Sequence, residues 1–137
     1  MKTKILLAAF CLTGIFYACS NAQEEEKKQL NEILAVHDKV MSESEQAMKN
    51  KITLDSLIKK HTGDTSKTNK PIALSKQLAV ADSSMEDWMH KFNADYTGKS
   101  HDEVMVYLNG QHKQLSQVDT LLTTAINQSN SYLSNTK

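Results

Sequence analysis

Apolar residues recur every three or four positions along most of the chain, which is the spacing of a helix that packs against a neighbour. The first such stretch predicts a helix over about residues 24–61. It should end at Thr62-Gly63, because glycine readily adopts the backbone conformation that follows a helix. The apolar seam predicted for this helix consists of Leu30, Leu34, His37, Met41, Ser44 and Met48.

Two further helices follow from the same spacing. The polar stretch 64–70 is predicted to be a loop, because Pro71 comes next and proline is tolerated at the first position of a helix. A helix over 71–93 should then pack through Leu74, Leu78, Ala81, Met85, Trp88 and Phe92. A capping box, Ser100 with Glu103, opens a third helix over 100–135. Its seam consists of His101, Val104, Leu108, Gln111, Leu115, Val118, Leu122, Ala125, Ser129 and Tyr132.

These elements predict an all-α protein, an antiparallel up-down-up three-helix bundle with coiled-coil-like heptad packing over residues 27–137. At about 1.5 Å per residue, the middle helix is roughly 20 Å shorter than its neighbours and cannot cover both of them. Apolar residues should therefore project at the two ends and be covered by a partner, a second copy or loops that fold back. These residues are Leu30, Ile33 and Leu34 at one end, and Ile126, Tyr132 and Leu133 at the other.

The N-terminus carries a secretory pattern. Lys2 and Lys4 precede an uncharged, mostly apolar run over residues 5–17, which is shorter than the about 20 residues that a membrane-spanning helix needs. We expect residues 1–18 to be a signal peptide. Of the two cysteines in the chain, Cys11 lies within this signal peptide and Cys19 follows it. The processed chain therefore keeps one cysteine and can form no internal disulfide.

The signal peptide ends at Tyr17-Ala18-Cys19, which resembles the lipobox of bacterial lipoproteins, although Tyr17 is bulkier than usual at that position. The resemblance implies a diacylglycerol on Cys19, cleavage after Ala18 and a further acyl chain, such as palmitate, on the new amino terminus. Two or more acyl chains anchor a protein stably to a membrane. The alternative is an ordinary secretory signal with an incidental cysteine.

Residues 19–26 are predicted to be an acidic tether that ends in three consecutive glutamates. Such a cluster resembles the export signal that sends Bacteroidota lipoproteins to the outer face of the outer membrane. Alternatively, the glutamates favour the first turn of a helix, where negative charge complements the helix dipole. We expect a lipid-anchored outer-membrane protein, with exposure at the cell surface as the further expectation.

Composition argues against several functions. All sixteen basic residues are lysine, and without arginine the chain lacks the usual bidentate contacts to phosphates and bases. No nucleophile elbow or phosphate-binding glycine loop surrounds any serine or threonine. We expect no nucleic-acid binding, no enzymatic activity and no cofactor.

One alternative function involves histidine and methionine. The predicted register brings His37, Met41, Met89, His101 and Met105 to one level of the bundle. Imidazole and thioether ligands together suit copper, and they also ligate haem in helical bundles. The other interpretation is that the methionines fill gaps in a narrow core.

The chain as a whole resembles a group of small Bacteroidota lipoproteins to which no activity is assigned. The resemblance is carried by residues 37–41, Met48 and residues 85–92. It implies a location and no mechanism. The expected function is a membrane-anchored envelope lipoprotein that acts as a non-enzymatic interaction or structural module, with a protein partner or a second copy of itself.

Overall fold

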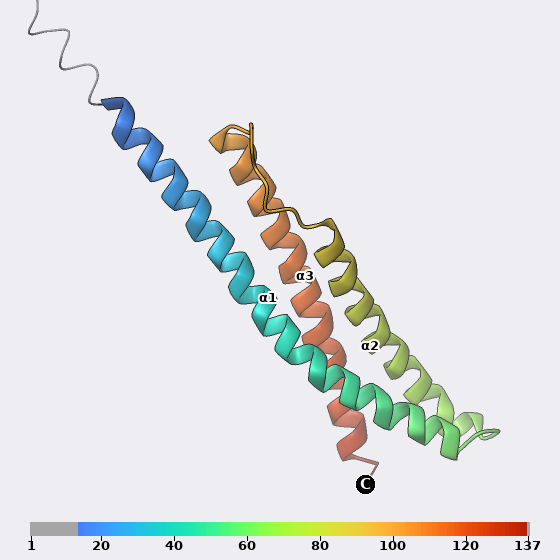
Figure 1. The fold of residues 1–137 in the computed structure, drawn as a ribbon. Coiled ribbons are helices and arrows are strands. Elements are labelled where there is room, and N and C mark those ends of the chain that lie inside the picture. The colour runs from blue at the N-terminus through green and yellow to red at the C-terminus, as the bar shows by residue number, and fades with distance from the viewer. Residues whose placement is uncertain (1–13, 137) are drawn as a thin grey trace, which may run out of the picture.

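Three helices pack against one another in a computed structural model of the chain, which describes residues 14–136 and the side chains from Asn21 onward. They are α1 (Gly14–Lys60), α2 (Thr65–Lys91) and α3 (His101–Ser134), with no strand in the described part (Figure 1). The predicted all-α three-helix bundle is confirmed. Over the same residues, no helix combines the length and the apolar character needed to cross a membrane.

The direction of each helix follows from its side-chain partners. Along α1 and α3, bonded residues keep a nearly constant separation in the sequence, which is 80 in three pairs, so these two helices run parallel. The pairs are Lys39 with Asp119, Glu43 with Thr123 and Asn50 with Asn130. Between α1 and α2, the partners converge along the chain instead, since His37 meets Trp88 and Asp55 meets Ser75. The order is therefore up-down-up, as predicted.

Helix α1 begins ten residues earlier than the predicted residue 24. It runs through residues 19–26, which were expected to form a tether, and no glycine or proline occurs between Gly14 and Gly63 to interrupt it. Its end agrees with the prediction, because Gly63 takes a φ of 94° just after the last turn.

The predicted loop over 64–70 is wrong, because α2 begins at Thr65 and not at Pro71. The Asp64 carboxylate caps the helix by accepting a hydrogen bond from the Ser66 amide at 3.1 Å. Pro71 then lies within the helix, where it cannot donate the usual backbone hydrogen bond. Its ring is almost fully buried, so burial in the core compensates for that loss.

The predicted seams of α2 and α3 are confirmed, with every member buried or half-buried. The seam predicted for α1 is correct at Leu30, His37 and Ser44, which are half-buried, and wrong by one residue at Leu34, Met41 and Met48. Its buried row, the inner seam, is Ile33, Val40, Ala47 and Leu54, each at most 3% exposed. Leu34, Met41 and Met48 are 42–49% exposed. Because α1 carries two apolar rows side by side, spacing alone does not determine which row packs.

The ends of the bundle are better covered than the helix lengths predicted. Ile33 and Ile126 are buried, and Leu30, Tyr132 and Leu133 pack on the core; only Leu34 projects. After α2, residues 92–100 form no helix, turn at Thr97-Gly98, and continue past the end of α2 alongside the first part of α3 (Figure 1). Phe92 and Tyr96 of this segment pack on the core, and the Asn93 amide donates to the Tyr107 hydroxyl at 2.8 Å. This loop thus covers the part of the bundle that α2 is too short to reach.

Candidate functional site

An apolar groove with a volume of about 460 Å³ lies between α2 and α3. Alanines line the base of the groove, where their small side chains leave space. Val80 and Leu121, each about half exposed, form its apolar edges. The lining residues are Ala73, Lys76, Gln77, Val80, Ala81, Thr120, Leu121, Thr124, Ala125 and Gln128. The α2–α3 groove offers burial to an apolar segment and contains no pair of groups suited to acid-base chemistry.

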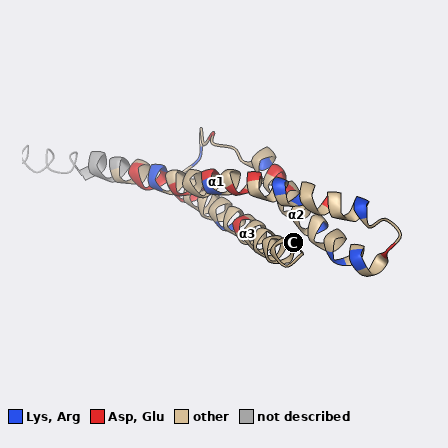
Figure 2. Cartoon of the chain, turned by 90° about the horizontal axis from the view of Figure 1, so that it is seen from below, with Lys and Arg blue, Asp and Glu red and all other residues tan. Residues whose placement is uncertain are grey.

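Charge is nearly absent around this groove. From Gln114 to its end at Ser134, α3 contains a single charged residue, Asp119, and its carboxylate accepts a hydrogen bond from Lys39 Nζ at 2.6 Å. Figure 2 shows α3 almost uniformly tan, whereas α1 and α2 carry many charged residues. Lys76 is the one charged residue among those that line the groove. A neutral or apolar segment therefore fits the groove better than a charged one.

A second apolar surface lies on the other side of α2, along α1. It comprises Leu34, Met41, Met48 and Ile52 of α1, which are 42–59% exposed, and Met89 of α2, which is 39% exposed. We call these five residues the outer stripe. Met48 shares a small hollow with Leu78 and Asp82 across the helix interface. Met89 follows Asp82 by seven residues and Met41 precedes Met48 by seven, so the antiparallel register places Met89 at the level of Met41.

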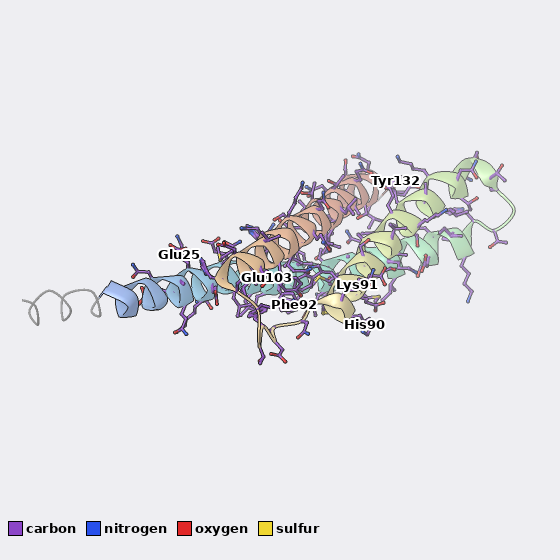
Figure 3. The ribbon with its side chains drawn as sticks, turned by 90° about the horizontal axis from the view of Figure 1, so that it is seen from above. Glu25, His90, Lys91, Phe92, Glu103 and Tyr132 are labelled. Carbon is purple, nitrogen blue, oxygen red and sulfur yellow. The ribbon has the colours of Figure 1, made fainter. Side chains whose placement is uncertain are left out.

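A polar clasp joins α1 to the start of α3. His101 Nδ1 lies 2.9 Å from Glu26 Oε1, and His101 Nε2 lies 3.5 Å from Glu25 Oε2. Figure 3 shows Glu25 on α1 close to the point at which α3 begins. The hydrogen bond to Glu26, together with the negative charges nearby, raises the pKa of His101 above its usual value. The clasp holds the N-terminal part of α1 against the bundle.

Sequence reasoning missed this clasp. Residues 24–26 had two interpretations, an export signal or the first turn of a helix, and no acidic residue lies in the first turn of α1. Two of the three glutamates bind an imidazole that lies 75 or more residues away in the sequence. These groups meet only because α1 and α3 pack in parallel, and no pattern of neighbouring residues in the sequence predicts that contact. The export hypothesis stays a prediction.

The residues of the metal alternative fall at two levels of the bundle. His37 packs against Trp88, with ring centroids 6.1 Å apart; Met41 lies one helical turn further along α1, and Met89 directly follows Trp88 in α2. His101 instead bonds to Glu26, which is eleven residues or about 16 Å along α1 from His37. Met105 lies one turn beyond His101. The copper or haem alternative would therefore have to depend on His37, Met41 and Met89 alone.

Nothing else in the described part favours that alternative. Across residues 14–136, no three or more histidine, cysteine, aspartate or glutamate side chains are placed to hold a metal ion together. Met41 and Met89 are open to solvent.

The predicted anchor is only partly within the described residues. Residues 1–13 of the expected signal peptide lie outside them, as does the Cys19 side chain, whereas the Cys19 backbone lies in α1.

Comparisons with protein families, with curated proteins and with solved structures gave no match to this chain. The resemblance to small Bacteroidota lipoproteins therefore stays a prediction that depends on the residues quoted above.

Proposed function

We propose that this chain is a non-enzymatic, lipid-anchored interaction module of the bacterial outer membrane. Acyl chains on Cys19 hold it at the membrane, and the α2–α3 groove receives an apolar segment of another protein. The proposed binding is supported by the groove itself, which Lys76 alone supplies with a charge. Alanines line its base, and the half-exposed side chains of Val80 and Leu121 line its edges.

The anchoring part is supported by the sequence around Cys19 and by the length of α1. Seven residues separate Cys19 from Glu26, the residue clasped by His101, and they span about 10 Å as a helix. A bundle anchored in this way stands close to the membrane on a short helical stalk. It would then meet its partners at the membrane surface, where their local concentration is high.

The anchor is tested by growing the source bacterium, or a host with lipoprotein processing, on an alkyne analogue of palmitate. The natural chain should incorporate the label and fractionate with the outer membrane. A Cys19→Ser variant should do neither. Equal labelling of both chains, or release of the natural chain by salt washing, would contradict the anchor.

The groove is tested by site-specific photo-crosslinking in living cells. A crosslinking residue at Leu121 should yield a discrete adduct with another protein. The same residue at Val106, which is 74% exposed on the same helix and does not line the groove, is the matched control. The proposal fails if position 121 gives no adduct, or if both positions give the same one.

A further inference from the structure

We propose that the outer stripe binds a basic amphipathic helix from a partner protein. The inference depends on neither Cys19 nor the α2–α3 groove, so it stands or falls separately from the function proposed above.

The spacing of the stripe is that of a helix-packing seam. Leu34, Met41 and Met48 are seven residues apart, and Ile52 follows one turn later. The inner seam has the same seven-residue spacing, and there it is buried by α2 and α3. A row of large apolar side chains at this spacing matches the groove-and-anchor geometry by which an amphipathic helix docks. The expected occupant is therefore a helix.

Three of the five side chains in the stripe are methionines. Methionine is unbranched and polarizable, and it adapts its shape to the residue that packs on it. A surface made of Met41, Met48 and Met89 can accommodate differing apolar side chains from a partner. The same property makes it common on surfaces that bind several amphipathic helices.

Acidic residues flank the stripe on both sides. On α1, Asp38 and Glu45 follow Leu34 and Met41 by one turn, and their side chains are 81% and 79% exposed. On α2, Asp82 lies beside Met48, and Glu86 lies between Asp82 and Met89. Carboxylates on both flanks favour an occupant with lysine or arginine beside its apolar face.

Few positive charges compensate for these carboxylates. Lys51 pairs with Asp55 at 2.7 Å, whereas Lys49 approaches Glu45 only to 4.0 Å. Over residues 14–136, Asp82 and Glu86 form no salt bridge. The stripe therefore keeps a net negative border.

The same border disfavours two other occupants. Anionic lipid headgroups would meet the carboxylates of Asp38 and Glu86, so the stripe is poorly suited to lie on an anionic membrane. Two copies joined stripe to stripe would bring the acidic borders together, and like charges at an interface oppose association. A partner helix with basic borders removes both difficulties.

The probe is a synthetic amphipathic peptide with leucines at helical spacing and lysines on both flanks. Its control carries glutamate in place of each lysine. The full chain is placed in phosphatidylcholine nanodiscs when it is acylated and in detergent micelles when it is not, and empty nanodiscs or micelles serve as the blank. Fluorescence anisotropy should show at least about tenfold tighter binding of the basic peptide, and added salt should reduce that preference.

Methionine methyl groups labelled with ¹³C locate the bound peptide. The NMR signals of Met41, Met48 and Met89 should shift on addition of the basic peptide. The signal of Met85, which is 2% exposed in the core, is the internal control and should stay in place. A shift at Met85 would report unfolding of the bundle.

Substitutions confirm the surface. Met41→Ser with Met48→Ser should weaken basic-peptide binding at least about tenfold, since truncated central contacts dominate interface energies. The matched control, Ile72→Ser with Val106→Ser, removes two apolar side chains that are 49% and 74% exposed elsewhere and should change binding less than twofold. Circular dichroism verifies that both variants keep the helical fold.

Four outcomes would overturn the proposal. The first is equal binding of the basic and acidic peptides, and the second is an unchanged peptide affinity in the Met41 and Met48 variant. The third is NMR signals of the stripe methionines that change with the number of protein copies per disc, and the fourth is signals that change when anionic lipid is added. The third outcome would assign the stripe to a second copy, and the fourth would assign it to the membrane.

Discussion

Helix α1 carries two apolar rows that differ by one position and share the same spacing, yet one is buried and the other is open. Ile33, Val40 and Ala47 of the inner seam are at most 3% exposed, whereas Leu34, Met41 and Met48 of the outer stripe are 42–49% exposed. A one-residue shift turns a helix by about 100°. The contrast shows that the faces of α2 and α3, and not the hydrophobicity of α1 alone, determine which row forms the core.

The largest expected effect is a stability difference between the two rows. Leu54→Ala removes a fully buried side chain of the inner seam and should lower the free energy of unfolding by about 2–5 kcal/mol. Met48→Ala removes a half-exposed one and should change it by about 0.5 kcal/mol or less. Urea denaturation followed by circular dichroism measures both. Similar losses from the two substitutions would remove the distinction.

A second prediction concerns the polar part of the buried face. Asn50 is 4% exposed, and its amide donates to Ser129 at 2.8 Å and to Asn130 at 2.7 Å, which joins α1 to α3. Asn50→Ala should lower the free energy of unfolding by about 1–3 kcal/mol, because the buried Ser129 hydroxyl loses its donor. Asn109→Ala, at an exposed position of α3, is the control. An unchanged free energy of unfolding in the Asn50 variant would mean that this contact does not help to set the register of α1 and α3.

The clasp at the N-terminal end of the bundle should depend on pH. The pKa of His101 is raised in the folded state by its hydrogen bond to Glu26. The contribution of the His101–Glu26 hydrogen bond to the free energy of unfolding is therefore fully present below the unfolded-state pKa of about 6.5. It is lost as the pH rises through the higher folded-state pKa.

Melting temperatures of the natural chain and a His101→Gln variant, measured across this pH range, test the clasp. The natural chain should be the more stable at acidic pH, and the difference should shrink as the solution becomes alkaline. A constant difference between the two proteins would show that protonation of His101 is not coupled to folding.

The smallest expected effect comes from the exposed ion pair on the α3-facing side of α1. Lys39 and Asp119 lie 2.6 Å apart, and the lysine side chain is 51% exposed, so solvent screens their attraction. A double-mutant cycle with Lys39→Ala and Asp119→Ala should give a coupling of about 0.2–1 kcal/mol that decreases with salt. A coupling as large as the loss in Leu54→Ala would contradict the view that the inner seam supplies most of the stability.

Much of the fold could be predicted from the sequence, because its signals are local. The capping box at Ser100 and Glu103 is present, with the Ser100 amide donating to Glu103 at 2.8 Å. The α3 seam was correct throughout, because apolar residues there form one row. Gly63 ended α1 as predicted. At Pro71 the prediction failed because the Asp64 cap lies seven residues earlier, and a buried proline ring is compatible with the helix that contains it.

The candidate surfaces were harder to predict because they depend on packing between helices. The predicted seam of α1 included Leu34, Met41 and Met48 in place of Ile33, Val40 and Ala47, since spacing cannot distinguish two adjacent rows of equal period. The three residues assigned wrongly to the core are members of the outer stripe. The α2–α3 groove and the clasp of His101 with Glu26 required the register of three helices, which no local pattern contains.

The most direct test of the contrast between the two rows is the rate at which hydrogen peroxide oxidises each methionine of the folded chain, followed by peptide mass spectrometry. Exposed thioethers react and buried ones are protected. The structure predicts fast oxidation of Met41, Met48 and Met89, which are 39–49% exposed, and slow oxidation of Met85, which is 2% exposed. Protection of Met41 and Met48 equal to that of Met85 would place the outer stripe in the core and contradict the account.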